Sequence, residues 1–170
     1  MGSQQQSPYQ VPPSEFVNAT NRADVILADC VAAGSTNTAV MIFPTVTDPT
    51  GAFSLSTSAA AGDAYTCVRP GMWAIDFFAA DAAAAASVIN IGISLNATAA
   101  TLNSTPVDFA VANNGLIAVA GTTSAAADLP LVYCHRLVRL VPGDVLRFMQ
   151  TATLTLDVNN TRVFMTRVSP

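Results

Sequence analysis

Short stretches of β-favouring residues, separated by turn residues, are the feature that most limits what this chain can fold into. In residues 87–95 (SVINIGISL), aliphatic side chains alternate almost strictly with Asn90, Gly92 and Ser94. A period of two residues is the pattern of a strand with one buried face. Many short strands of this kind predict an all-β sandwich or barrel.

Turn signals such as DPTG, RPG, NNG and VPGD mark where the strands end. The run 79–87 (AADAAAAAS) is too short for a stable helix by itself, so we interpret it as strand continuation or a close-packed loop, with a one-turn helix as the alternative. The expected strands are Ala39–Val46, Ala64–Val68, Met72–Ala79, Ser87–Leu95, Gly115–Ala120, Leu131–Leu140, Asp144–Leu156 and Arg162–Val168.

The composition favours an assembled protein. The chain has 170 residues, enough for one domain with a sizeable core. Only 11% of its residues are charged and 51% are hydrophobic, whereas soluble domains have about 25% charged residues. A surface so poor in charge is prone to association. All seven cations are arginines, which suit interfacial pairing, although a GC-rich genome is the alternative explanation.

The first 23 residues form a separate segment in front of the predicted domain, 24–170. Their prolines and glutamines favour an extended arm rather than a core element. The apolar positions of this arm are its expected anchors on a partner. They are Tyr9, Val11, Pro12, Pro13, Phe16 and Val17.

Candidate catalytic groups are few. The single histidine, His135, follows Cys134 in a strand-like stretch, where neighbouring side chains point to opposite faces. The chain has three cysteines, Cys30, Cys67 and Cys134, which are widely spaced and predict buried free thiols. We therefore expect no enzyme activity, no cofactor and no metal, with a calcium site in the turn 47–51 as the alternative.

Charge and hydropathy also bear on partners. The net charge is −4 and the basic residues form no run, which argues against nucleic-acid binding. No apolar run reaches the roughly 18 residues that span a bilayer. Met1 is followed by a polar stretch without a visible secretory signal, which predicts maturation in the cytoplasm.

Three segments resemble the tumour necrosis factor and complement globular-head superfamily. Residues 65–77 (YTCVRPGMWAIDF) look like the Pro-x-Gly-x-aromatic start of its central strand, with Trp73 where that family usually has Tyr. Residues 137–148 look like its Gly-Asp hairpin, and Arg162–Val168 like its final strand. The resemblance covers roughly residues 39–168. The hairpin turn consists of Pro142, Gly143 and Asp144.

The resemblance implies a jelly-roll sandwich of about 8–10 antiparallel strands that packs as a homotrimer. It also suggests four aromatic residues for the core or the threefold seam, and we expect Trp73 and Phe164 in particular to be largely buried. The four are Trp73, Phe77, Phe148 and Phe164.

Members of this superfamily include secreted ligands, spore-surface proteins, and decoration proteins and fibre heads of tailed bacteriophages. The expected function is a homotrimeric cement protein that is assembled in the host cytoplasm and binds the major capsid protein on the virion surface. A receptor-binding or fibre-tip module is the alternative, although loops 96–103 and 113–128 lack Trp and Tyr anchors. A viral coat protein is a further alternative, but this arm has no cation before Arg22.

Overall fold

Ten strands run through the part of the chain that the computed structural model describes, namely residues 25–29, 40–43, 45–48, 50–58, 61–80, 88–98, 102, 115–123, 131–150 and 160–170. Every pairing between these strands is antiparallel. The strands are β1 (Val25–Asp29), β2 (Thr45–Thr47), β3 (Phe53–Ser58), β4 (Gly62–Cys67), β5 (Gly71–Ala80), β6 (Val88–Leu95), β7 (Leu116–Thr123), β8 (Leu131–Leu140), β9 (Val145–Gln150) and β10 (Arg162–Ser169).

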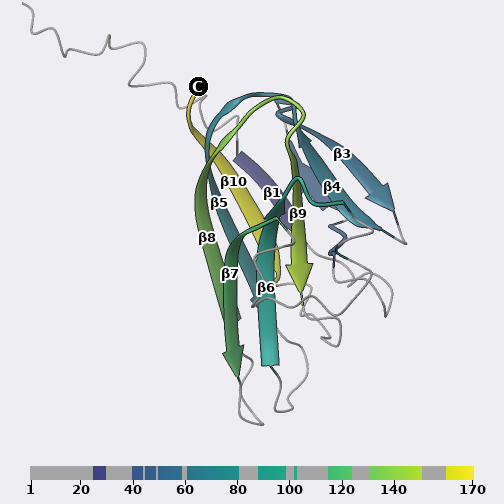
Figure 1. Cartoon of the computed structure of the whole chain (residues 1–170), viewed down its shortest axis with the longest axis vertical. Helices are drawn as coiled ribbons and strands as arrows, with labels where there is room; N and C mark the ends of the chain where they lie inside the picture. Colours follow the sequence, from purple (N-terminus) through teal and green to yellow (C-terminus); the bar gives the residue numbers. More distant parts are fainter. Residues whose placement is uncertain are drawn as a thin grey trace, which may run out of the picture.

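The strands form two five-stranded sheets (Figure 1). The first sheet has the order β2-β1-β10-β5-β8 and the second the order β3-β4-β9-β6-β7. The last strand of the chain, β10, lies between β1 and β5, and β9 lies between β4 and β6, so the chain crosses repeatedly between sheets. Such an arrangement is a jelly roll. The predicted fold class is therefore confirmed.

Strand β5 shows why one face of the first sheet is buried. Trp73, Ile75 and Phe77 are fully buried, while Ala74 and Asp76 between them are only half-buried. Successive side chains of a strand point to opposite faces, so the odd-numbered positions face the second sheet. The even-numbered positions face outward.

Aromatic rings fill the space between the two sheets. Phe43, Tyr65, Phe77 and Phe148 contact one another edge to face, with ring centroids 5.4–6.4 Å apart. Edge-to-face pairs of this kind add about 0.5–1.5 kcal/mol beyond the burial of their area. Trp73 packs at 4.9 Å against Phe53 from the second sheet. The rings therefore join the two sheets.

Two strands were not predicted from the sequence. Strand β3 pairs with β4 along its whole length. Four of its six side chains are exposed, and three of the six are serines. It therefore lacks the apolar alternation that identifies a strand. Strand β1 is held by its backbone pairing with β2 and β10.

The predicted strand Ala39–Val46 is found only in part: among its described residues, Val40 forms an isolated antiparallel bridge with Met149 of β9, and β2 begins at Thr45. The backbone N–H of Phe43 donates to the Asp63 carboxylate at 2.6 Å instead of to a neighbouring strand. The predicted strand Asp144–Leu156 begins at Val145 and extends to Gln150 within the described residues. Its remainder, 151–156, and most of the alanine run, 81–87, lie outside them.

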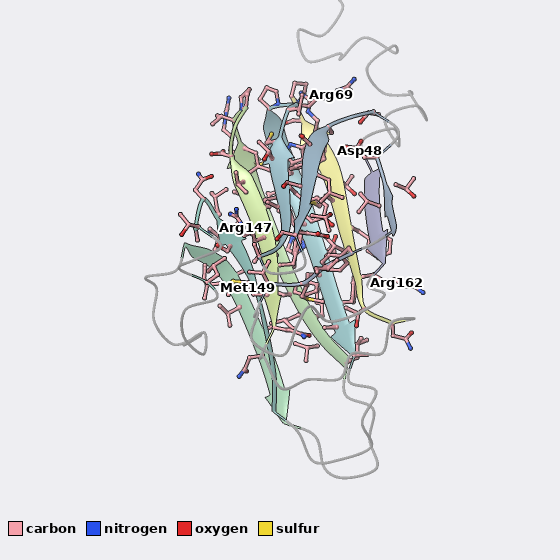
Figure 2. The ribbon with its side chains drawn as sticks, turned by 90° about the vertical axis from the view of Figure 1, so that its right-hand side faces the viewer. Asp48, Arg69, Arg147, Met149 and Arg162 are labelled. Carbon is pink, nitrogen blue, oxygen red and sulfur yellow. The ribbon has the colours of Figure 1, made fainter. Side chains whose placement is uncertain are left out.

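One end of the sandwich brings together three segments that are far apart in the chain. They are the β4–β5 turn (68–70), the β8–β9 turn (141–144) and the last three residues (168–170), and we call them the turn end. The N–H of Gly143 donates to the Cys67 carbonyl at 2.9 Å, and Arg167 Nη2 donates to the Pro70 carbonyl at 2.6 Å. Arg69 lies at this end and Arg162 towards the other (Figure 2).

Among the residues that the structure describes, no helix has the length and apolar character needed to cross a membrane.

Candidate functional site

The outward face of the first sheet carries a group of aromatic side chains. Register places Phe78 between Arg162 on β10 and Tyr133 on β8, and places Asp76 between Phe164 and His135 in the next row. We call these outward residues of β5, β8 and β10 the aromatic face. They are Asp76, Phe78, Tyr133, His135, Arg162 and Phe164.

The rings of the aromatic face contact one another. Phe78 stacks on Tyr133 with centroids 4.7 Å apart and meets Phe164 edge to face at 6.0 Å. Tyr133 remains 48% exposed, although its inward neighbour Cys134 is buried. Leu131 and Leu137 on the same strand are 58% and 52% exposed. Strand β8 thus presents a row of large apolar side chains to its surroundings.

A carboxylate organises the polar part of this face. Asp76 Oδ1 accepts a hydrogen bond from the Tyr133 hydroxyl at 2.5 Å and another from His135 Nδ1 at 2.8 Å. The hydrogen bond to Asp76 raises the pKa of the Tyr133 hydroxyl, because loss of that proton would place two negative charges side by side. Asp76 is therefore already paired within its own subunit.

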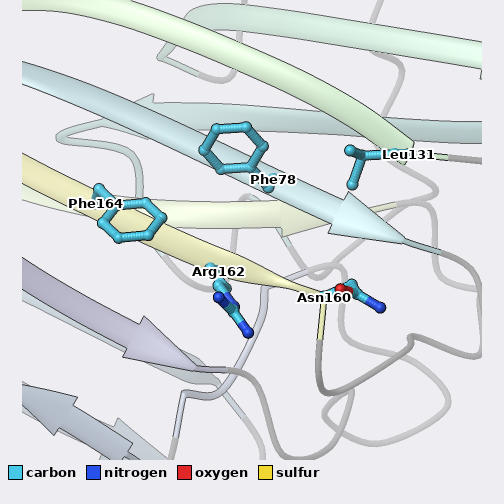
Figure 3. A pocket seen from close by; sticks show the side chains of 5 residues that line it. All are labelled: Phe78, Leu131, Asn160, Arg162 and Phe164. Atoms are coloured by element: carbon cyan, nitrogen blue, oxygen red, sulfur yellow. The ribbon is translucent and has the colours of Figure 1, made fainter.

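A shallow hollow of about 230 Å³ opens beside these rings, and Figure 3 shows the side chains around it. Phe78 and Phe164 form its aromatic part, and Leu131 lies at the start of β8. Asn160 and Arg162 supply its polar edge. The combination of apolar floor and polar edge suits contact with another protein surface.

The described residues offer little for metal or thiol chemistry. They contain no group of three or more His, Cys, Asp or Glu residues that could hold a metal ion. In the turn 47–51, which is the alternative calcium site, the Asp48 carboxylate accepts hydrogen bonds from the N–H groups of Thr50 and Phe53. Burial raises the pKa of Cys134 to about 11 and also raises that of Cys67, which leaves both thiols protonated at neutral pH.

The residues proposed for the core or seam separate into two places. Trp73, Phe77 and Phe148 lie in the core with at most 1% exposure. Phe164 is of intermediate burial and lies on the aromatic face, outside the core. The reason is register, because Phe164 pairs with outward-facing Asp76. For Phe164, a seam position remains a prediction.

The remaining predicted positions are a turn and the arm. Pro142, Gly143 and Asp144 form the β8–β9 turn, in which Gly143 has a φ of +93° that favours glycine. The carboxylate of Asp144 accepts hydrogen bonds from the Val141 N–H and from Asn96. All six arm residues lie outside the described residues, as does Cys30.

Sequence reasoning missed Phe78, Tyr133 and Leu131 as surface aromatic and aliphatic positions. The signal was present for Phe78, because it directly follows Phe77 in a strand. Two adjacent side chains of a strand cannot face the same core, so one ring of the pair had to point outward. Tyr133 is likewise adjacent to buried Val132 and Cys134.

Comparison with known proteins gives a likeness of fold. No protein-family model matches the chain, and no curated protein sequence matches it. Murine APRIL, in its structure at pH 5.0, matches with a TM-score of 0.62 and 10% identity over 85% of this chain and 98% of that one. The globular domain of zebrafish complement 1qA protein matches with a TM-score of 0.53 and 14% identity over 84% and 94%. The chain therefore has the jelly-roll fold of these two proteins.

Proposed function

We propose that this chain is a structural, non-catalytic protein that forms a homotrimer through its aromatic face and decorates the outside of a bacteriophage capsid as a cement protein. The first part is supported by the exposed face and by the jelly-roll fold. The second part is supported by the low charge of the chain and by an N-terminal segment of a composition suited to tethering.

The observation that carries self-association is the group of rings on the first sheet. Phe78, Phe164 and half-exposed Tyr133 contact one another on an outward surface, with Leu131 and Leu137 beside them. Removing apolar area from water contributes about 25 cal/mol per Å², so covering this surface stabilises an assembly. Exposed apolar side chains that contact one another in this way are typical of an interaction surface.

The aromatic face can bind other copies of the same chain, and the reason is electrostatic. A buried carboxylate without a partner strongly opposes association. Asp76 already accepts hydrogen bonds from Tyr133 and His135 of its own subunit, so each copy would bring a hydrogen-bonded carboxylate to the seam. The low proportion of charged residues in the chain supports the same arrangement.

Native mass spectrometry and sedimentation velocity test the trimer. The wild-type chain is expected to be trimeric at micromolar concentration, and Phe78→Asp to shift it towards monomer because a carboxylate would be buried among rings. Val119→Asp is the matched control, since Val119 is 45% exposed on β7 of the other sheet. A wild-type chain that sediments only as a monomer would contradict the proposal.

Decoration is tested with capsid shells of the parent phage that lack the chain. Added trimer should bind these shells, appear as ordered density on their outer surface by electron cryomicroscopy, and raise the temperature at which they rupture. Shells that neither bind the trimer nor gain heat resistance would exclude the cement function. Binding to host cells instead of shells would identify a receptor-binding module.

A further inference from the structure

The turn end of the sandwich is an exposed apolar surface that the aromatic face does not include. Val68, Val141 and Val168 are 51%, 52% and 60% exposed, one from each of the three segments. Pro70 and Pro142 beside them are exposed as well. Single exposed aliphatic residues are common, but apolar side chains that gather from three distant segments mark an interaction surface.

This surface is held rigidly by the sandwich. The N–H groups of Val68 and Arg69 both donate to the Ala52 carbonyl, at 2.8 and 3.1 Å. The N–H of Val141 donates to the Asp144 carboxylate at 2.8 Å. Trp73 Nε1 donates to the Arg69 carbonyl at 3.3 Å, which ties the β4–β5 turn to the largest core side chain. A surface that is ordered before binding loses little conformational entropy on contact.

The charges at this end differ in sign from the charge of the whole chain. The exposed charged side chains here are Arg69 and Arg139, whereas the chain carries a net charge of −4. The carboxylates of Asp48 and Asp144 are half-buried and accept hydrogen bonds from their own turns. Arginine forms bidentate pairs with carboxylates at interfaces. The surface therefore complements an apolar partner surface that bears carboxylates.

Strand β1 begins at the same end of the sandwich. It starts at Val25, which pairs with Thr166 near the end of β10. The aromatic face is centred nearer the other end, where Arg162 pairs with Phe78 (Figure 2). The two surfaces can thus be occupied together.

We infer that the turn end is the surface by which the assembled protein sits on the capsid shell, against an apolar, carboxylate-bearing patch of capsid protein. The inference rests on the proposed function. It assigns to Val68, Val141 and Val168 the apolar contact and to Arg69 and Arg139 the ionic contact. The arm and the turn end are then both required for binding to the shell.

Shell binding by surface variants tests this assignment. Val68→Asp and Val141→Asp are expected to weaken binding of the full-length protein to capsid shells about tenfold or more, because each places a carboxylate against apolar area and like charge. Arg69→Glu should weaken binding most at low salt, where ionic contacts are least screened. Leu55→Asp and Val119→Asp, exposed to 40% and 45% on the second sheet, are the matched controls and should bind normally.

Each outcome has a distinct meaning. If wild-type protein fails to bind shells, the proposed function fails and this inference with it. If wild-type protein binds and the turn-end variants bind equally well, only the inference is overturned. Variants that lose the trimer by sedimentation would assign the turn end to self-association instead. Binding to vesicles of equal parts phosphatidylcholine and phosphatidylglycerol, and not to shells, would identify a membrane surface as the partner.

Discussion

Trp73 shows at the scale of one residue how the two sheets are joined. The side chain is fully buried, packs on Phe53, and has its indole N–H satisfied by the Arg69 carbonyl. Replacement by Ala should cost about 3–5 kcal/mol, as for other large aromatic truncations in packed cores. Urea unfolding measures this loss. Phe164→Ala, at a half-buried outward position, should cost less under conditions in which both variants are monomeric.

Asp63 gives the chain a pH-dependent stability. Its carboxyl is 1% exposed, and burial raises its pKa above 3.8, although the hydrogen bond from the Phe43 N–H acts in the opposite direction. A raised pKa means that the folded state favours the protonated form. The contribution is therefore fully present below about pH 3.8 and is lost as the pH rises through the folded-state value.

Asp63→Asn should remove this dependence while its amide oxygen still accepts from the Phe43 N–H. The unfolding free energy of the variant, relative to wild type, is expected to increase as the pH rises above 3.8, because the wild type then loses the contribution of its protonated carboxyl group. Urea titrations at several pH values measure the difference. A difference that stays constant with pH would show that burial does not control this carboxyl group.

At the scale of strands, Gly71 controls how closely β5 approaches β10. It has a φ of +148°, and a Cβ at this position would lie 2.4 Å from the Ser169 carbonyl oxygen. Gly71→Ala should therefore destabilise the fold by roughly 1–3 kcal/mol through crowding and backbone strain. Gly143→Ala is the control, because Gly143 also has a positive φ but has open space around its Cβ position. Equal losses for the two would mean that crowding contributes nothing.

At the scale of the whole molecule, the arm is predicted to act as a tether and the jelly roll as the body. Ordering an extended segment costs about 1–2 kcal/mol per residue in backbone conformational entropy. The segment therefore needs apolar anchors such as Tyr9 and Phe16 to stay bound to a partner. Deletion of residues 1–17 should leave a folded trimer that no longer adds to shells. Sedimentation checks the trimer, and electron cryomicroscopy measures shell occupancy. Unchanged occupancy and heat protection would leave the turn end as the sole contact.

The positions of individual rings could be predicted only in part. Alternation along β5 was enough to indicate that one face of the strand is buried, and Phe77 lies on that face. Alternation could not assign Phe164, because β10 has apolar residues at Val163 and Met165 as well as at Phe164. Its pairing with β5 puts Phe164 beside outward-facing Asp76. The partner strand, and not the local pattern, decided its face.

Residue alternation and turn chemistry predict an all-β protein with short strands, because both patterns act over only a few positions of the chain. Tertiary structure decided which strands became neighbours, since β1, β5 and β10 meet across more than 130 residues of chain. It also decided both proposed surfaces. The aromatic face needs the register of three strands, and the turn end needs two turns and the chain terminus to converge. Only long-range packing brings these residues together, so the local spacing of residues in the sequence does not predict either surface.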